Sequence, residues 1–500
     1  MMSLSEIGMA IFLGYLGLMV LIGIVCARYQ KNMDSFWVAG RNIGLPIMVM
    51  AMMASVMHGG AILSGVALAA KDGGVAILPF ISMALGTLIV LVYFAEKLRL
   101  MAGYTLPDYM GERFNSRFLR GYSAFIVALS SIIYLIAQVR VMGFVLQQLL
   151  GVSFTTGLLL GTAIFVFYVT FGGFLAVVWT DVAQFWFMWL GLLVLVPGLY
   201  HLVGGWSEVL AKVEQVAPGW TSPTGVSWSW TYLVSWYVVW LVAYATRVEL
   251  VTKIYAARDV NVARFALPLN VAMIILFLLY GNFYLGAAAR VLVWDQISSP
   301  DQAFPVLVTT TVSPFLAAVA LTGIISAGMS TTSSLLIIAG ASIAHDLLRK
   351  CYYEPNGVFK SETFYLRISR ITILIVGVVA FLGALRTPEL ILVLVSYAVA
   401  FLGVTFFFPL LFGLKWKRVS REAAIASAVG GSVVTGIWTV LNLMKVPWAT
   451  QLHPALPGLA VALVFIVVLT RYTQPVPRTC LAKFFPEEAR LVSSVSASES

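Results

Sequence analysis

A dense row of hydroxyl side chains lies between residues 326 and 334 of this chain. Four serines there share one helical face, at spacings i, i+4, i+7 and i+8: Ser326, Ser330, Ser333 and Ser334. Hydroxyl oxygens suit a hard cation such as Na+, which prefers oxygen ligands. A single hydroxyl can instead bond back to its own helix, but five in succession from residue 330 to residue 334 favour a cation site.

Charged residues interrupt the apolar segments at a few positions. Asp181, if buried, must be protonated, paired or bound to a cation, so ion coupling and a structural ion pair both stay open. Arg140, close to Gln138, offers a fork suited to a carboxylate of the protein or of an anionic substrate. Arg247 and Glu249 do not face each other on a regular helix, so they can pair only where the segment is unwound.

A glycine pair, Gly59 and Gly60, lies inside the apolar segment 45–70 and weakens a helix there. A break would free carbonyl oxygens and helix ends that can hold a cation or face an anionic group. Close packing of small residues against a neighbouring helix is the alternative. His58 beside the pair could be a packed, hydrogen-bonded histidine or could contact the substrate.

The elements that position these residues follow from the composition. Of 500 residues, 61% are hydrophobic and 10% are charged, whereas soluble domains carry about 25% charged residues. This excludes a soluble enzyme, a disordered protein and a nucleic-acid binder, despite the net charge of +10. The sequence predicts an all-α polytopic membrane protein.

Because a bilayer-spanning helix needs roughly 20 apolar residues, we predict thirteen transmembrane helices. They lie near residues 6–27, 45–70, 74–95, 121–150, 155–172, 174–203, 229–257, 262–290, 312–348, 364–385, 389–413, 420–442 and 454–471. They form one transmembrane domain, residues 1–471, and residues 472–500 form a short cytoplasmic tail.

The distribution of basic residues predicts the orientation. Most of the 31 Lys and Arg residues fall in the loops of one side and in the tail, among them Lys253, Arg258 and Arg264. The positive-inside rule then places the N-terminus outside and the C-terminus in the cytoplasm. The four histidines are scattered, and the chain has no metal-binding Cys/His spacing or phosphate-binding glycine loop. We therefore expect a protein that is not an enzyme.

Four stretches together resemble the sodium:solute symporter family, which includes Na+-coupled proline, pantothenate, sialic acid, sugar and monocarboxylate carriers. They are Gly172 to Asp181 with Gln184, Met329 to Ser334 with Asp346, Thr105 to Tyr109, and Leu414 to Arg418. The resemblance extends from about residue 5 to residue 471. It implies Na+-coupled symport of a small organic solute by alternating access across the cell inner (plasma) membrane. It also implies a LeuT-type core of two inverted five-helix repeats, at about 45–203 and 229–413.

The resemblance also implies site residues. The common Na+ site would use backbone carbonyls of Ser55, His58 and Ala327 and hydroxyls of Ser330 and Thr331. A second Na+, present in some members, maps to Asp181, Ser330, Ser333 and Ser334.

Departures from the family pattern at His58 and around Arg247 predict an unusual substrate. Because the Arg140 guanidinium suits a carboxylate, we expect a small carboxylate, such as a monocarboxylate, pantothenate or a proline-like amino acid. The candidate substrate-binding residues are His58, Gly59, Gly60, Gln138, Arg140, Arg247 and Glu249. H+ coupling through Asp181 and a transporter-like membrane sensor remain alternatives. The expected partners are the solute, Na+ and the lipid bilayer, with no nucleic acid.

Overall fold

The structure, a computed structural model, describes residues 4–30, 32–386, 391–485 and 487–488. These residues form helices, and their one strand-like pairing is an isolated bridge between Ile43 and Ala257. The predicted all-α class is confirmed. Residues 389–390 of the predicted eleventh span and residues 486 and 489–500 of the predicted tail lie outside the described residues.

The helices follow one another in the following order. The first half contains α1 (Leu4–Ala27), α2 (Met33–Val38), α3 (Leu45–Val56), α4 (Gly59–Asp72), α5 (Ile77–Ile89), α6 (Ala95–Met101), α7 (Leu106–Arg113), α8 (Arg117–Leu150), α9 (Phe154–Val203), α10 (Trp206–Val216) and α11 (Trp230–Ala245). The second half contains α12 (Val248–Ala256), α13 (Val260–Phe277), α14 (Leu285–Leu292), α15 (Ala303–Thr311), α16 (Pro314–Ala341), α17 (Glu362–Ala384), α18 (Ile391–Gly413), α19 (Arg421–Leu443), α20 (Ala455–Tyr472) and α21 (Arg478–Leu481). Three π-helical stretches extend neighbouring helices: η3 (Val90–Phe94), η4 (Leu278–Tyr284) and η7 (Ser342–Tyr353).

Within the described residues, 11 helices are long and apolar enough to cross a membrane, and the bent pair α3–α4 raises that number to 12. The predicted spans 155–172 and 174–203 both lie in α9, which contains 50 residues. At 1.5 Å per residue α9 is about 75 Å long, more than twice the ~30 Å hydrocarbon core. Gly173 interrupts it with a left-handed φ of 58°, a conformation that only glycine adopts at little cost.

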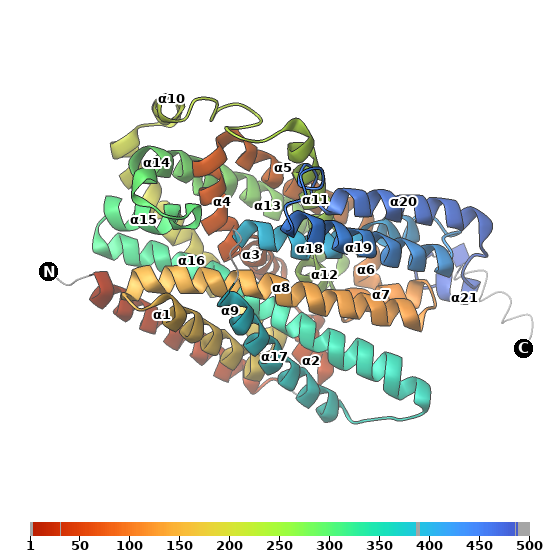
Figure 1. Cartoon of the computed structure of the whole chain (residues 1–500). Helices are drawn as coiled ribbons and strands as arrows, with labels where there is room; N and C mark the ends of the chain where they lie inside the picture. Colours follow the sequence, from red (N-terminus) through yellow and green to blue (C-terminus); the bar gives the residue numbers. More distant parts are fainter. Residues whose placement is uncertain (1–3, 31, 387–390, 486, 489–500) are drawn as a thin grey trace, which may run out of the picture.

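The centre of the bundle is built from α8, α9 and α16, which pack against one another. In Figure 1, α8 and α16 lie side by side across the middle of the view, and α19 and α20 lie together at one side. Small residues allow α9 and α16 to approach closely: a Cβ added to Gly191 would lie 3.2 Å from Ala320 Cα, and one added to Gly323 would lie 2.9 Å from the Phe187 carbonyl. Such contacts are typical of helix pairs inside membranes.

The outer helices carry apolar side chains on their free faces. On α1, α17 and α19, more than half of the surface of several large side chains is exposed: Leu13, Leu21, Val378, Leu382 and Ile437. A continuous apolar surface of this kind is unfavourable in water and favourable against lipid. The side-chain distribution therefore agrees with the apolar helix lengths in indicating a polytopic membrane protein.

Candidate functional site

The predicted second span is broken after α3. Helices α3 and α4 are bent by 50° relative to each other, and Met57 and His58 between them leave helical geometry. His58 starts the new helix, because its Nδ1 accepts the amide N–H of Ala61 at 3.0 Å. The glycine after it permits a close approach to α16, since a Cβ on Gly59 would lie 2.9 Å from Gly328 Cα. Both readings of the glycine pair thus apply, a helix break and close packing.

The break frees the last carbonyl groups of α3, and side chains from other helices donate to them. Ser330 donates its hydroxyl to the Ala54 carbonyl at 2.8 Å, and Thr331 donates to the Ser55 carbonyl at 3.1 Å. Tyr244 donates to the carbonyl of Val56 at 3.2 Å. A buried carbonyl without a partner is costly, so these contacts fix α16 against the end of α3.

A second break separates α11 from α12 at Thr246 and Arg247. Because the chain is unwound there, the Arg247 guanidinium reaches the Glu249 carboxylate, at 3.5 Å between Nη2 and Oε1. This confirms the prediction that the two residues can pair only in an unwound segment. Arg247 also donates to the Tyr134 hydroxyl at 3.0 Å and lies over the Tyr244 ring, 4.7 Å from its centroid.

Five neutral oxygen atoms gather where α16 meets the end of α3. They are the Ser330 and Thr331 hydroxyls and the carbonyls of Ala54, Ser55 and Ala327, of which the last accepts from Ser330 at 2.9 Å. Such a donor set has the chemistry that Na+ requires. The His58 carbonyl, also predicted as a ligand, accepts the amides of Ala61 and Ile62 at the start of α4. Ala54 was not among the predicted ligands.

A buried ion pair lies next to these oxygens. Lys253 Nζ is 3.0 Å from Asp181 Oδ2, and the two side chains are 1% and 0% exposed. The ammonium also donates to the Ser55 hydroxyl and, at 3.4 Å, to the Ser334 hydroxyl. Ser333, which was predicted with Ser334 as a ligand of a second Na+, instead donates to the carbonyls of Met329 and Ser330 in its own helix.

Assigning Lys253 to a basic cytoplasmic loop was wrong, because α12 carries it into the bundle, where it is buried. A signal was present in the sequence. Lys253 lies inside the predicted span 229–257, and a lysine within a span needs a partner. Asp181 is the buried carboxylate that supplies it.

Two polar side chains near the start of α4 are incompletely bonded. His58 and Gln138 are fully buried, with 3.4 Å between His58 Nδ1 and Gln138 Nε2. His58 Nε2 and Gln138 Oε1 have no hydrogen-bond partner in the described part of the chain. A Cβ on Gly60 would lie 3.1 Å from the His58 ring and 3.2 Å from the Gln138 amide. This pair can therefore offer one donor and one acceptor to a small polar solute.

Arg140 lies away from this pair. Two residues along α8 correspond to about 200° around the helix, so Arg140 and Gln138 face different sides. Arg140 is half-buried, lies 5.9 Å from the Phe144 ring centroid and interacts electrostatically with Asp301. Asp301 in turn accepts the Ser64 hydroxyl at 2.9 Å. Arg140 Nε has no hydrogen-bond partner in the described part of the chain, so the structure favours neither of the two alternatives for Arg140.

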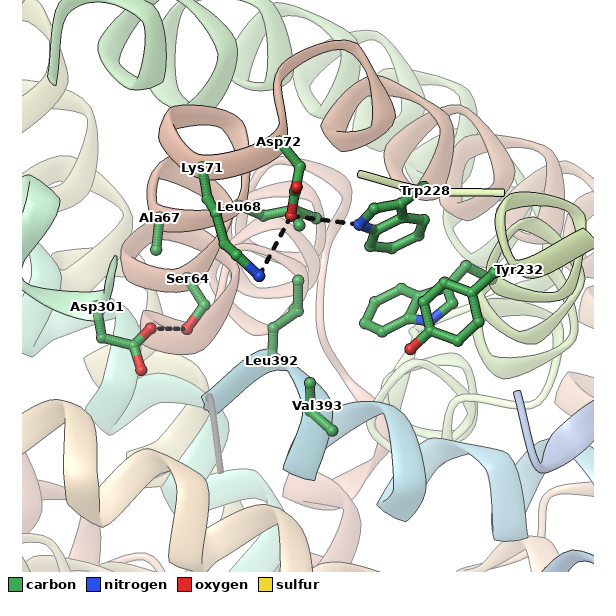
Figure 2. Close-up of a pocket in the computed structure, with 11 residues that line it drawn as sticks. Ser64, Ala67, Leu68, Lys71, Asp72, Trp228, Tyr232, Asp301, Leu392 and Val393 are labelled. Atoms are coloured by element: carbon green, nitrogen blue, oxygen red, sulfur yellow. Dashed lines mark hydrogen bonds and ion pairs between the residues drawn. The ribbon is translucent and has the colours of Figure 1, made fainter. Parts of the chain in front are cut away.

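A cavity of about 150 Å³ lies further along α4 (Figure 2). Figure 2 shows Lys71 and Asp72 at one edge, with Asp72 joined to Trp228 at 3.3 Å and to Lys71 at 3.6 Å. The remaining lining residues come from α4, α11, α18 and the segment before α15: Ser64, Ala67, Leu68, Tyr232, Trp236, Asp301, Leu392 and Val393. The cavity combines charged and aromatic surface, as small-molecule sites do.

A separate cluster of buried charges lies beside α7. Asp108 accepts from Arg120 at 2.8 Å, from His345 at 2.9 Å and from the Tyr104 amide at 2.9 Å. Burial raises the pKa of Asp108, but His345 and Arg120 beside it lower this pKa well below its usual range. The spacing of Asp108, His345 and Asp346 could hold a metal ion. Since Asp108 is already well bonded by the chain, a structural role suits this cluster better.

Known proteins resemble the chain over nearly its whole length. The family model described as "Sodium:solute symporter family" matches residues 36–431. The chain is 28% identical to a sodium/proline symporter of Escherichia coli strain K12, over 97% of each chain. It is 25% identical to the sodium/pantothenate symporter of the same strain, covering 92% of this chain and 96% of the relative.

Among solved structures, a Na+-coupled sialic acid symporter in a substrate-bound outward-open state has a TM-score of 0.78 to this chain at 18% identity. The match covers 94% of this chain and 99% of that one. The nucleobase-cation-symport-1 family transporter MHP1 has a TM-score of 0.55 at 14% identity, covering 92% of this chain and 98% of that one. At these identities the likeness establishes the fold.

Proposed function

Because the chain belongs to the sodium:solute symporter family, it is a Na+-coupled symporter of a small organic solute, and we propose that this solute is a small carboxylate bound at the start of α4. The family consists of transporters rather than enzymes. The observation that carries the proposal is the unbonded, buried His58 Nε2, which can donate to a carboxylate beside Gly59 and Gly60. The unbonded Gln138 Oε1 is an acceptor and would bind a donor group of the same solute.

The chemistry of α4 favours an anionic group. Its 14 residues begin beside this pair, and the positive dipole end of a helix N-terminus favours an anion. His58 already bonds the Ala61 and Ile62 amides, so the dipole rather than these amides would act on the anion. Three similar proteins are named as symporters of proline, pantothenate and sialic acid, and each of these solutes carries a carboxylate. We propose that His58, Gly59, Gly60 and Gln138 contact the solute. Arg247 and Glu249 then serve mainly as partners of each other.

For the coupling ion, we propose a Na+ bound by the Ser330 and Thr331 hydroxyls and by the carbonyls of Ser55, Ala54 and Ala327. The hydroxyls already lie within 2.8–3.1 Å of these carbonyls. Rotation of the two O–H groups, together with release of the Arg247 guanidinium from the Ser55 carbonyl, would expose five oxygen atoms to the ion. Bound Na+ would draw α16 and the end of α3 together. The outward-facing state would thereby be stabilised before the solute enters.

For the topology, we propose thirteen crossings of the cell inner (plasma) membrane, with the N-terminus outside and the C-terminus cytoplasmic. Counting α9 as two crossings, broken at Gly173, adds one to the twelve that include the bent pair. The two broken helix pairs, α3–α4 and α11–α12, would open two inverted repeats at about 45–203 and 229–413. Residues 1–471 would form one domain and residues 472–500 a short tail.

Uptake into vesicles tests the coupling. A potential of ~100 mV supplies about 2.3 kcal/mol per charge, and a tenfold Na+ gradient adds about 1.4 kcal/mol. One Na+ can therefore concentrate a zwitterionic solute roughly 500-fold. A thermal-shift screen of carboxylates, amino acids and sugars, with and without Na+, identifies the solute for this assay. Unchanged uptake after Na+ is replaced by K+ or choline would contradict the proposal.

A further inference from the structure

The surroundings of the Lys253 ammonium are those of a cation site. It is bordered by one carboxylate oxygen, from Asp181, and by the hydroxyls of Ser55 and Ser334. These groups come from three different helices, α9, α3 and α16, while Lys253 itself comes from α12. Carboxylate and hydroxyl oxygens are the groups that a sodium ion would select at this position.

The charge balance of this position admits one cation. Asp181 is fully buried, and a buried carboxylate must be neutralised by a partner. Among the described residues Lys253 is its ion-pair partner, and Asp181 Oδ1 has no hydrogen-bond donor. A sodium ion added beside the ammonium would meet a like charge at short range in a medium of low dielectric constant. The ammonium and the ion therefore exclude each other.

We propose that Lys253 is a tethered cation that fills the position between Asp181, Ser55 and Ser334 in place of a second sodium ion. The oxygen ligands could hold two sodium ions, but with Lys253 in one position the chain binds only one. That ion lies at Ser330 and Thr331. This inference rests on the proposed Na+-coupled function. Because the lysine stays in the protein, its charge neutralises Asp181 in every cycle without being released to either side.

Sodium binding to the purified, full-length chain in detergent tests the proposal with NaCl alone as the probe. Radioactive Na+ bound per chain is counted at equilibrium, with choline replacing Na+ in the blank. The wild type is expected to bind one ion. Lys253→Met keeps an unbranched side chain but removes the charge, so Asp181 recruits a sodium ion and the count rises to two. In Lys253→Met/Asp181→Asn, which has no buried charge at this position, the count returns to one.

Control variants separate this effect from loss of folding. Lys350→Met removes a lysine paired with Glu354 at a partly exposed site and should leave the count unchanged. Lys253→Gln, which can still hydrogen-bond, serves as a second variant if Lys253→Met fails to fold. The wild-type count needs no variant at all: one ion supports the proposal, and two ions overturn it.

The difference between variant and wild type tests the tethered cation, and the wild-type count also tests the proposed first site. Equal counts in wild type and Lys253→Met would overturn the tethered cation. A wild-type count of zero that rises to one in Lys253→Met would overturn the Na+ site at Ser330 and Thr331 and support the tethered cation. The failure of one proposal is thus distinguishable from the failure of the other.

Discussion

The guanidinium of Arg247 donates to the carbonyl oxygen of Ser55 at 2.8 Å, so the break between α11 and α12 supplies a donor to a carbonyl freed by the break between α3 and α4. Thr331 of α16 donates to the same carbonyl. One backbone oxygen therefore joins both broken helices to the helix of the proposed sodium site. A change of partner at Ser55 would be felt by all three elements, which is a physical route from ion binding to helix movement.

Removing Arg247 should destabilise the fold strongly. In Arg247→Met, Glu249 stays buried without its cationic partner and the Ser55 carbonyl loses a donor. Loss of one member of a buried ion pair costs about 3–5 kcal/mol. We expect Arg247→Met/Glu249→Gln to recover a large part of this loss, because no unpaired charge remains. Thermal unfolding in detergent measures both.

A surface ion pair provides the matched control. Arg264 and Glu96 lie 3.6 Å apart with both side chains more than half exposed, and such pairs contribute about 0–1 kcal/mol. Arg264→Met should therefore leave the melting temperature nearly unchanged. An equal loss in the two arginine variants, or no recovery in the double variant, would show that the buried pair does not hold the two breaks together.

The two adjacent threonines of α16 should differ in their effect on Na+ binding. Thr331 faces the Ser55 carbonyl, whereas Thr332 donates to the Gly328 carbonyl of its own helix at 2.7 Å. Thr331→Val should raise the Na+ concentration for half-maximal thermal stabilisation about tenfold, equivalent to about 1.4 kcal/mol. Thr332→Val should change it less than about threefold. Thermal-shift assays in which NaCl replaces choline chloride stepwise measure both values. Equal effects of the two substitutions would show that Thr331 does not bind the ion.

Gly59 is expected to tolerate no side chain. A Cβ there would lie 2.9 Å from both Gly328 Cα and Val141 Cγ1, and neither the backbone of α16 nor the buried valine can withdraw easily. Gly59→Ala should cost about 1–3 kcal/mol, as overpacking does. Gly14→Ala is the control, because nothing lies within 4 Å of an added Cβ there. Similar melting temperatures for the two variants would show that α4 and α16 do not meet this closely.

Much of the fold follows from apolar periodicity and length alone, because a membrane requires a nearly fixed length of apolar helix. The break just before Gly59 could also be predicted, from the glycine pair, and so could the unwinding at Arg247, from two charges at a spacing that does not let them meet on a regular helix. Span counting is harder at Gly173, where two predicted spans form one interrupted helix. There the sequence contains a glycine pair but no polar loop to mark a turn.

The candidate site was less predictable, because it depends on which side chains meet across helices. Its position near the end of a span predicts a loop for Lys253, yet its long side chain reaches Asp181, 72 residues earlier in the chain. Ala54 could not be identified as a ligand, since a freed carbonyl has no signature in residue type. The charge of Arg140 makes it a candidate for binding a carboxylate, but whether its side chain faces the solute depends on the rotation of α8 about its axis, which the sequence does not give.

Variants of Gln138 and Arg140 should distinguish two positions for the solute along α8, one beside His58 and one near the cavity of Ser64 and Asp301. Gln138 lies beside His58 with an unbonded carbonyl oxygen, while Arg140 interacts electrostatically with Asp301. With the carboxylate that gives the largest Na+-dependent thermal shift, Gln138→Leu should weaken binding tenfold or more, about 1.4 kcal/mol. Arg140→Leu should weaken it less than about threefold. If Arg140→Leu instead causes the larger loss while Na+ binding is unchanged, the solute carboxylate is held near the cavity of Ser64 and Asp301.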